Sequence, residues 1–375
     1  PDATLARGLD LLEAISRRAA YLALLQQYPQ ALQKVAQLVS ASSWAASYLT
    51  RHPVLLDELL DARLLEAAPD WAAFRAQLAR ELDEHEPDTE RQMDVMREAH
   101  HAQVFRLLAQ DLGGMLALEK LSDHLSELAD IMLDLALRLV WRKLLKRHRE
   151  EPQFAVVAYG KLGGKELGYA SDLDIIFLFD DDHPDAPETY ARLAQRLNTR
   201  SPTATPAGLP LQTDPRLRPN GESGLLVSSV AAFRQYQMES AWVWEHQALT
   251  RARFSAGDAG IGRQFEAIRI EVLRQPRDLP ELKREVAAMR QKMADAHANK
   301  SDLFDIKHDR GGLIDVEFIV QALVLGHAHA HAELTGNLGN LALLKIAAGL
   351  GLIPEALAER VREAYRSYRR LQHSL

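Results

Sequence analysis

The stretch Tyr159-Gly-Lys-Leu-Gly-Gly-Lys-Glu-Leu-Gly-Tyr-Ala-Ser-Asp-Leu-Asp-Ile-Ile-Phe177 decides the fold of this chain. The apolar run before it, Phe154 to Ala158, is typical of a short buried strand. A glycine-rich turn and a brief helical stretch follow. Asp172 to Phe179 then predicts a second strand, because it is rich in branched and aromatic residues. The predicted fold depends on these two strands, the glycine turn and the Asp-x-Asp pair that opens the second strand.

Asp172 and Asp174 stand two positions apart at the start of the second predicted strand. Residues two apart on a strand point to the same face, so we expect both carboxylates to lie opposite Leu173 and Ile175. Two carboxylates side by side repel each other unless a cation lies between them. Mg²⁺ suits this position, because one or two carboxylates hold it together with substrate phosphates. The sequence therefore predicts a magnesium site at this pair.

The glycine turn supplies the second half of a nucleotide site. Gly163 and Gly164 are expected to precede a helical turn, where free backbone N–H groups and the helix dipole favour a phosphate. The absence of side chains at these positions lets phosphates approach the backbone closely. Lys161 and Lys165 add positive charge to the same place. We therefore predict that this turn binds the phosphates of a nucleotide.

Two other phosphate-binding motifs fail on spacing. A P-loop needs four residues between its glycines, whereas Gly160 and Gly164 enclose only three. A Rossmann fingerprint lacks its first glycine, because Ala158 occupies that place. The interval from Gly164 to Ser171 is also too short for the crossover between two parallel strands. The two strands are therefore not expected to form a dinucleotide-binding unit.

A third carboxylate is needed to activate an attacking hydroxyl or to hold a second metal ion. Asp214 is the candidate, within a short strand predicted from Leu211 to Leu217. Arg216 and Arg218 alternate with Leu217, so both can reach one face. Their guanidinium groups would neutralise part of the charge of a triphosphate.

The rest of the chain is predicted to be mostly helical, which gives the α+β fold class. Residues 1–150 are expected to form a helical bundle domain, residues 151–257 the catalytic domain, and residues 258–375 a truncated C-terminal helical domain. Within the catalytic domain, residues 187–200 predict a helix and residues 225–228 a further short strand. The chain starts without a methionine and stops inside a helical pattern, so we interpret it as a fragment of a longer protein.

Composition narrows the classes of function. The 375 residues carry a formal net charge of −7, which argues against a general nucleic-acid binder. The sequence contains no cysteine, so disulfides and cysteine-based metal or redox sites are excluded. No window approaches the roughly 18 uninterrupted apolar residues of a membrane span, so we expect no membrane association.

These motifs closely resemble the adenylylating half of the glutamine synthetase adenylyltransferases, large bacterial proteins with two nucleotidyltransferase domains. The resemblance implies a polymerase-beta-like nucleotidyltransferase domain flanked by helical bundles. Gly168-Tyr169 and Leu173 favour the adenylylating type over the deadenylylating type. The other segments that carry the resemblance are Asp214-Pro-Arg-Leu-Arg-Pro-Asn-Gly221, Trp244-Glu-His-Gln-Ala-Leu-Thr-Arg-Ala-Arg253 and Phe304-Asp-Ile-Lys-His-Asp-Arg-Gly-Gly-Leu-Ile-Asp-Val-Glu-Phe318.

The resemblance implies a cytoplasmic enzyme that uses Mg²⁺ and ATP to move AMP onto a tyrosine of glutamine synthetase, with release of pyrophosphate. Asp172, Asp174 and Asp214 would be the catalytic and metal-binding acids. The PII signalling protein would be a partner of the full-length enzyme. Phosphorolytic removal of AMP and a non-catalytic ATP-sensing module remain alternatives. The residues that would contact the nucleotide are Lys161, Gly163, Gly164, Lys165, Ser171, Arg216 and Arg218.

Overall fold

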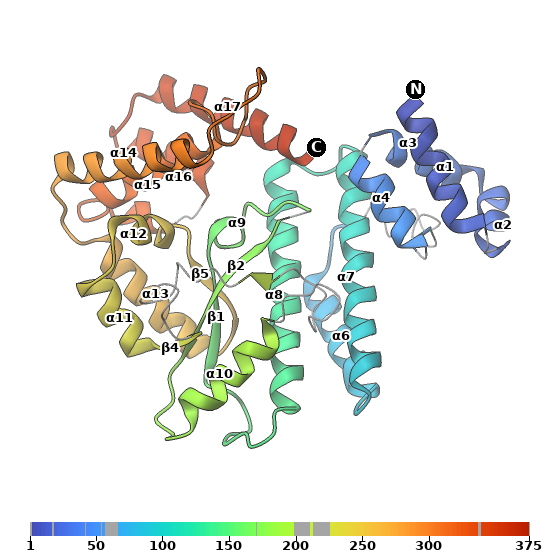
Figure 1. Cartoon of the computed structure of the whole chain (residues 1–375), viewed down its shortest axis with the longest axis horizontal. Helices are drawn as coiled ribbons and strands as arrows, with labels where there is room; N and C mark the ends of the chain where they lie inside the picture. The colour runs from blue at the N-terminus through green and yellow to red at the C-terminus, as the bar shows by residue number, and fades with distance from the viewer. Residues whose placement is uncertain are drawn as a thin grey trace. The chain divides into compact units, whose positions relative to one another are not determined.

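The computed structural model describes residues 2–16, 19–41, 43–53, 55–56, 67–169, 171–198, 211–212, 226–336 and 339–374. The chain forms two compact units, residues 1–128 with 370–375 and residues 129–369. Helices make up most of the described residues, and the sheet belongs to the second unit (Figure 1). The prediction of a mostly helical α+β chain is therefore confirmed. The division into three domains stays a prediction.

The described part of the first unit is helical. Its sequence sets where two of the longer helices begin, because an Asp side chain caps each of them. Asp70 accepts the N–H of Ala73 at 2.9 Å, and Asp88 accepts the N–H of Arg91 at 3.0 Å. The helices are α1 (Asp2–Ser16), α2 (Ala19–Gln27), α3 (Pro29–Ala41), α4 (Ser43–Arg51), α6 (Trp71–Glu84), α7 (Thr89–Leu112) and the first part of α8 (Leu118–Arg142).

The second unit packs helices around a small sheet. Its strands are β1 (Phe154–Ala158), β2 (Leu173–Phe179), β3 (Leu211–Gln212), β4 (Val227–Ser229) and β5 (Arg253–Gly257). Its helices before β5 are the rest of α8, α9 (Gly160–Gly163), α10 (Ala186–Leu197), α11 (Val230–Glu239) and α12 (Val243–Leu249). Those after β5 are α13 (Ala259–Leu273), α14 (Leu279–Ala296), α15 (Leu313–His327), the 3₁₀ helix η4 (Ala332–Thr335), α16 (Asn340–Gly349) and α17 (Glu355–Ser374).

The sheet has the order β3-β2-β1-β5, and β4 also pairs with β2. β1 runs antiparallel to β2, with Phe154 opposite Phe179 and Ala158 opposite Ile175. This direction excludes a Rossmann βαβ unit, whose strands are parallel, and it agrees with the short connection in the sequence. β3 and β4 are both parallel to β2, β3 beside its first residues and β4 beside its last.

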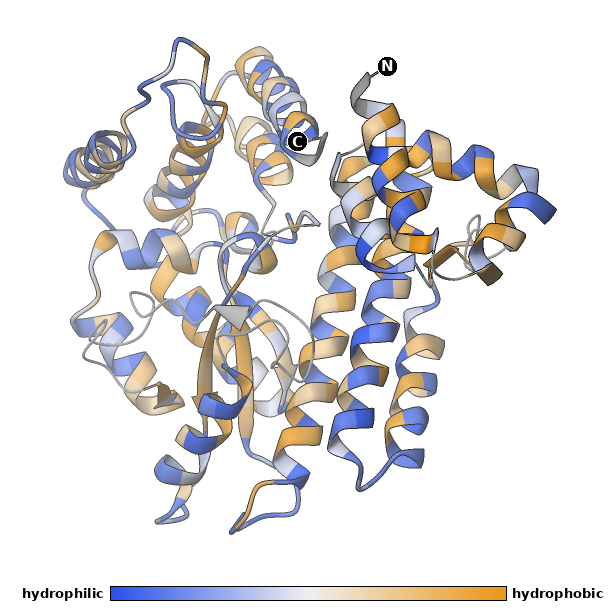
Figure 2. Ribbon diagram, turned by 45° about the vertical axis from the view of Figure 1, so that its right-hand side comes forward, coloured by the Kyte–Doolittle hydropathy of each residue, from blue (hydrophilic) through white to orange (hydrophobic). Residues whose placement is uncertain are grey.

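Helices cover the sheet on both faces, and this explains the continuous apolar runs of β1 and β2. On one face, Ile176 belongs to a core cluster with Phe233 of α11 and Phe265 of α13. On the other face, the ring of Phe154 lies 5.6 Å from that of Tyr190 on α10. In Figure 2 the two central strands are accordingly hydrophobic along their length, whereas most helices show both colours.

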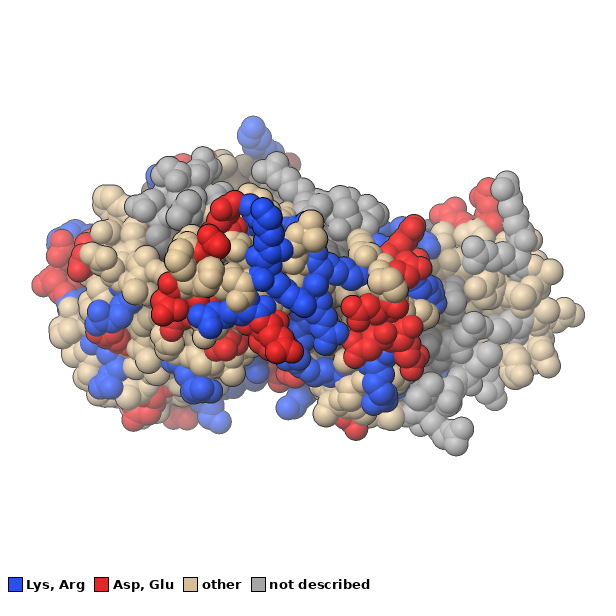
Figure 3. Space-filling view, turned by 90° about the horizontal axis from the view of Figure 1, so that it is seen from below, with Lys and Arg blue, Asp and Glu red and all other residues tan. Residues whose placement is uncertain are grey.

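The surface carries charges of both signs. Figure 3 shows Lys and Arg side chains as well as Asp and Glu side chains on the face that it draws. This mixture differs from the basic surplus that nucleic-acid binders usually show. Within the part of the chain that is described, no helix combines the length and the apolar character needed to cross a membrane.

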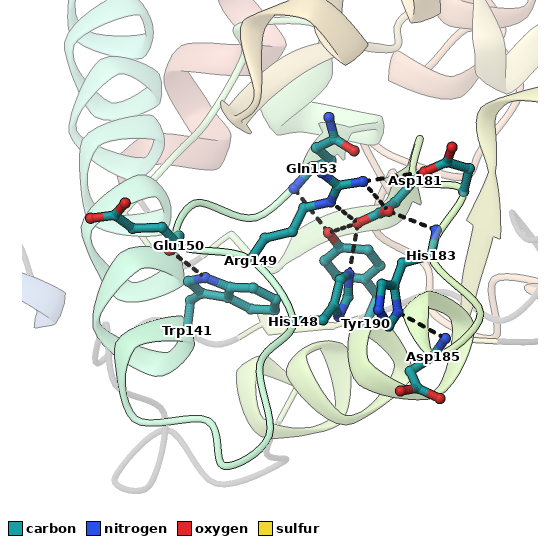
Figure 4. Close-up of polar contacts among 10 residues, drawn as sticks. Trp141, His148, Arg149, Glu150, Gln153, Asp181, His183, Asp185 and Tyr190 are labelled. Atoms are coloured by element: carbon teal, nitrogen blue, oxygen red, sulfur yellow. Dashed lines mark hydrogen bonds and ion pairs between the residues drawn. The ribbon is translucent and has the colours of Figure 1, made fainter.

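Asp181 anchors the end of the sheet where β1 begins and β2 ends (Figure 4). Its fully buried side chain accepts two hydrogen bonds of 2.8 Å from Arg149 and one of 2.7 Å from the hydroxyl of Tyr190. His148 Nε2 lies 2.8 Å from the same carboxylate, and the N–H of His183 donates at 3.0 Å. Burial alone would raise the pKa of Asp181, but these hydrogen bonds outweigh it and hold the pKa well below its usual value.

We expect Asp181→Asn to lower the melting temperature at pH 7 by about 5 °C or more, because several buried hydrogen-bond donors lose a charged acceptor. The folded-state pKa is depressed, so the stabilisation is complete above the unfolded-state pKa of about 3.9 and is lost as the pH falls below it. The difference between variant and wild type should therefore shrink towards pH 3. Thermal melts at pH 7 and pH 3 check this, and an equal difference at both would contradict it.

Candidate functional site

The Asp-x-Asp pair lies at the start of β2. Leu173 and Ile175 are buried, whereas Asp174 is half-buried and Asp172 is exposed. This is the alternation that a strand imposes on successive side chains. The two carboxylates are thus turned away from the apolar side chains between and after them, towards the edge of the core.

The carboxylate of Asp174 lies directly against Gly160. A Cβ atom added to this glycine would stand only 2.1 Å from Asp174 Oδ2. Gly160 also has a φ of +55°, a conformation that glycine adopts without strain. The N–H of Tyr159 donates to the backbone oxygen of Asp174 at 2.8 Å, which fixes the two chain segments together. No side chain other than hydrogen fits between this turn and the carboxylate.

The glycine turn differs from its prediction in one respect. The expectation that Gly163 and Gly164 precede a helical turn is wrong, because α9 begins at Gly160 and ends at Gly163. The N–H of Gly163 donates to Tyr159 O at 2.8 Å, and the N–H of Gly164 donates to Gly160 O at 3.0 Å. These two N–H groups therefore close the turn itself.

Close packing explains why residues 163 and 164 are both glycine. A Cβ atom at Gly163 would lie 2.0 Å from the backbone oxygen of Arg251. A Cβ atom at Gly164 would lie 2.8 Å from Nε of the same arginine. The turn thus sits on the backbone and the side chain of Arg251, and any larger residue would lift it away.

The lysines and the serine predicted for the site occupy three different environments. Burial lowers the pKa of Lys161, and the nearby charges of Arg369 and Lys307 lower it further. Lys165 is exposed and has a φ of +51°, which is uncommon for a residue with a side chain. Ser171 accepts the N–H of Gly168 through its hydroxyl at 2.9 Å, which closes the loop before the Asp-x-Asp pair.

The remaining predicted site residues, Asp214, Arg216 and Arg218, lie outside the described residues. The strand predicted to carry Asp214 is described only at Leu211–Gln212, where Gln212 pairs with Asp174 of β2. Among the residues that are described, no three His, Asp or Glu side chains gather to form a metal-binding group. The predicted three-acid metal site is therefore untested.

Two residues that pack against the glycine turn, Glu166 and Arg251, were not predicted from the sequence. Glu166 is a buried carboxylate one residue after Lys165, and it pairs with Arg251 at 2.6 Å. Both residues belong to motifs that were singled out, but nothing in either motif indicates that their side chains meet. A charged residue inside a glycine-rich apolar turn was the only available signal.

Two families match this chain. Residues 32–268 match the family described as glutamate-ammonia ligase adenylyltransferase. Residues 281–375 match the family described as GlnD PII-uridylyltransferase. The first match covers more than half of the chain, and it includes the glycine turn and the Asp-x-Asp pair.

Several curated relatives are similar over the whole chain, and each is named bifunctional glutamine synthetase adenylyltransferase/adenylyl-removing enzyme. The relative from Aromatoleum aromaticum is 71% identical over 373 residues, covering 100% of this chain and 40% of the relative. Those from Chromobacterium violaceum and Nitrosomonas europaea are 62% and 60% identical, covering 100% of this chain and 42% and 41% of the relatives. The chain thus spans about two fifths of the length of these relatives.

Proposed function

This chain belongs to the glutamate-ammonia ligase adenylyltransferase family, and on that premise we propose that it transfers AMP from ATP to a tyrosine of glutamine synthetase and releases pyrophosphate. Such a transfer in the cytoplasm would lower the activity of the synthetase and so regulate nitrogen assimilation. The full-length enzyme would also respond to the PII signalling protein. We further propose that the sheet with its glycine turn is a polymerase-beta-like nucleotidyltransferase domain.

The observation that carries this proposal is the packing of Asp174 against Gly160. A carboxylate lies within contact of a turn that has no side chain at that point, so carboxylate and phosphate groups can approach one ion from two sides. Asp172, which directly precedes β2, supplies a second carboxylate. The match of residues 281–375 to uridylyltransferases adds support, because that family also transfers nucleotides.

The donor set fits Mg²⁺. Asp172 and Asp174 offer only oxygen ligands, and Mg²⁺ prefers one or two carboxylates with substrate phosphates completing its shell. Asp214 is proposed as the third acid, and the pairing of Gln212 with Asp174 supports its assignment to the same site. When bound, the ion would supply positive charge that offsets the charge of the triphosphate.

The residues of the chain then have distinct tasks in the proposed reaction. Lys161, held in place by the glycine turn, binds the phosphates, and Lys165, Arg216 and Arg218 add positive charge around them. Asp214 accepts the proton of the tyrosine hydroxyl. The hydroxyl oxygen bonds to the α-phosphorus, the bond from that phosphorus to the bridging oxygen breaks, and pyrophosphate leaves with the electron pair. AMP remains on the tyrosine.

The test incubates this chain with glutamine synthetase, Mg²⁺ and ATP labelled in its α-phosphate. We expect label on the synthetase and release of pyrophosphate. A second sample contains adenylylated synthetase and inorganic phosphate, and release of ADP there would assign the chain to the adenylyl-removing reaction instead. Binding of ATP with no transfer in either sample would favour a non-catalytic ATP-sensing module.

Gly160→Ala is expected to lower kcat of AMP transfer by about 10²-fold, because the new methyl group overlaps the Asp174 carboxylate and displaces it by roughly 1 Å. Gly351→Ala is the matched control. Gly351 also has a positive φ, of +72°, but an added Cβ atom there would have no neighbour within 4 Å. Gly351→Ala should therefore introduce similar backbone strain and leave kcat of AMP transfer unchanged. Equal activities of the two variants would count against the proposed site.

A further inference from the structure

Glu166 is a buried carboxylate next to the glycine turn with several polar partners. Its side chain accepts the hydroxyl of Tyr365 at 2.7 Å and the amide of Asn340 at 3.1 Å. It forms ion pairs with Arg251 at 2.6 Å and with Arg369 at 3.2 Å. All five residues are buried. A buried carboxylate with this many partners stays charged and tolerates little displacement.

The charge on Glu166 depends on these partners. Burial by itself would raise the pKa of the carboxyl group. The charges of Arg251 and Arg369 and the hydrogen bond from Tyr365 outweigh burial, so the pKa lies below its usual value. The folded protein therefore holds a full negative charge at the base of the turn.

The partners come from distant parts of the chain. Asn340 begins α16, and Tyr365 and Arg369 lie on α17, 174 to 203 residues beyond Glu166. Arg369 also donates to the backbone oxygen of Glu166 at 2.7 Å, so both the main chain and the side chain of this residue are tied to α17. In the view of Figure 1, α16 and α17 lie above α9.

Arg251 extends the connection to a third helix. Its second nitrogen pairs with Glu317 of α15 at 3.0 Å. Because Gly164 packs on the same guanidinium group, the position of α15 is transmitted to the turn through one side chain. Helices α15, α16 and α17 are thus all connected to residues 164–166, either directly through Glu166 or through Arg251.

A backbone hydrogen bond connects Glu166 to Lys161. The N–H of Glu166 donates to the backbone oxygen of Lys161 at 2.8 Å, so the residue anchored by α17 also closes the turn on this lysine. Lys161 is half-buried, and the charges that act on it include the cations Arg369 and Lys307 and the anion Glu317. Because the cations prevail, Lys161 lies in a locally positive environment, which attracts a polyphosphate.

We propose that Glu166 is a positioning residue through which α16 and α17 hold the glycine turn in the form that presents Lys161 to the phosphates of ATP. The inference rests on the proposed function and adds a role for the C-terminal helices in it. Loss of the Glu166 charge would loosen the turn without removing any group that contacts the nucleotide. The expected effect is therefore on nucleotide binding.

The experiment compares Glu166→Gln with wild type by titrating a fluorescent ATP analogue in the presence of Mg²⁺, and by measuring KM for ATP and for glutamine synthetase. We expect Kd and KM for the nucleotide to rise about tenfold and KM for the synthetase to stay unchanged. Tyr365→Phe removes a single hydroxyl and should shift Kd in the same direction by about threefold. This second variant keeps the test decisive should Glu166→Gln fail to fold.

Asp181→Asn is the matched control, since it neutralises another carboxylate with a buried side chain, at the opposite end of the same sheet. It should leave Kd for the nucleotide unchanged. Unchanged Kd in Glu166→Gln and Tyr365→Phe, with wild-type AMP transfer intact, would overturn the positioning role alone. Nucleotide binding without AMP transfer in wild type would overturn the proposed function, while weaker binding by Glu166→Gln would still support the role of this residue.

Discussion

Asp174→Asn is expected to lower kcat of AMP transfer by at least about 10²-fold, the loss typical when a group that organises transition-state charge is removed. The side chain keeps its size, so its fit against Gly160 is preserved. It loses the negative charge that would hold Mg²⁺, because a neutral amide is a weaker ligand than a carboxylate. The backbone hydrogen bond from Tyr159 to residue 174 is unaffected by the change.

The rate of label transfer from ATP to glutamine synthetase checks this result, together with a thermal melt. Asp180→Asn is the control, because Asp180 directly follows β2 at the opposite end of the same strand and is exposed. The two variants should melt at nearly the same temperature and differ only in rate. If Asp174→Asn transfers AMP as fast as Asp180→Asn, this carboxylate has no part in the reaction.

Arg251→Met is expected to lower the free energy of unfolding by about 3–5 kcal/mol, because it removes one of the two cations paired with the buried Glu166 and also the cation paired with the half-buried Glu317. Arg251 is only 6% exposed, and it bridges Glu166 and Glu317 at 2.6 and 3.0 Å. The methionine has a similar length but donates no hydrogen bond. A loss of this size corresponds to a drop in melting temperature of roughly 10 °C for a unit of this size.

Thermal and urea unfolding of the variant measure this loss. Arg234→Met provides the comparison, because Arg234 pairs with Glu271 on the surface, where both side chains are at least 41% exposed. Exposed pairs contribute little to stability, so this variant should melt close to wild type. Equal melting temperatures for the two arginine variants would show that the buried bridge does not hold the turn.

The two expected results separate a residue of the proposed reaction from a residue that stabilises the turn, although Asp174 and Arg251 both contact the same glycine turn. Asp174 stands at the edge of the core, where its loss removes charge from the site but little packing. Arg251 lies beneath the glycine turn, where its loss removes support for the turn without removing a proposed ligand. The opposite pattern, in which Asp174→Asn unfolds the protein and Arg251→Met only slows it, would reverse these assignments.

The positions of the first two strands and the orientation of Asp172 and Asp174 could be predicted from the sequence. The apolar run Phe154–Ala158 became β1, and the run predicted from Asp172 became β2 from Leu173. The helix predicted at 187–200 was found at Ala186–Leu197. These features follow from periodicity and residue type within a few positions, and such local preferences hold wherever the segment lies in the fold.

The role of Gly163 and Gly164 could not be predicted from the sequence. Its composition indicated a close approach of some group to the backbone, and that much is right, but the group in contact is Arg251 from the same chain. A glycine in the sequence indicates that some group comes close to the backbone, but it does not show whether that group is a ligand or a side chain of the same protein. Only the packing of the turn on the residues that precede β5 decides this.

By itself, the sequence determined two adjacent strands, a tight turn between them and two carboxylates on one side of the second strand, because each depends on side chains a few residues apart. Tertiary structure alone decided that Gly160 touches Asp174 and that Asn340, Tyr365 and Arg369 surround Glu166. These contacts join residues up to 203 positions apart. Local preferences carry no information about such distances, and long-range packing of the helices sets them.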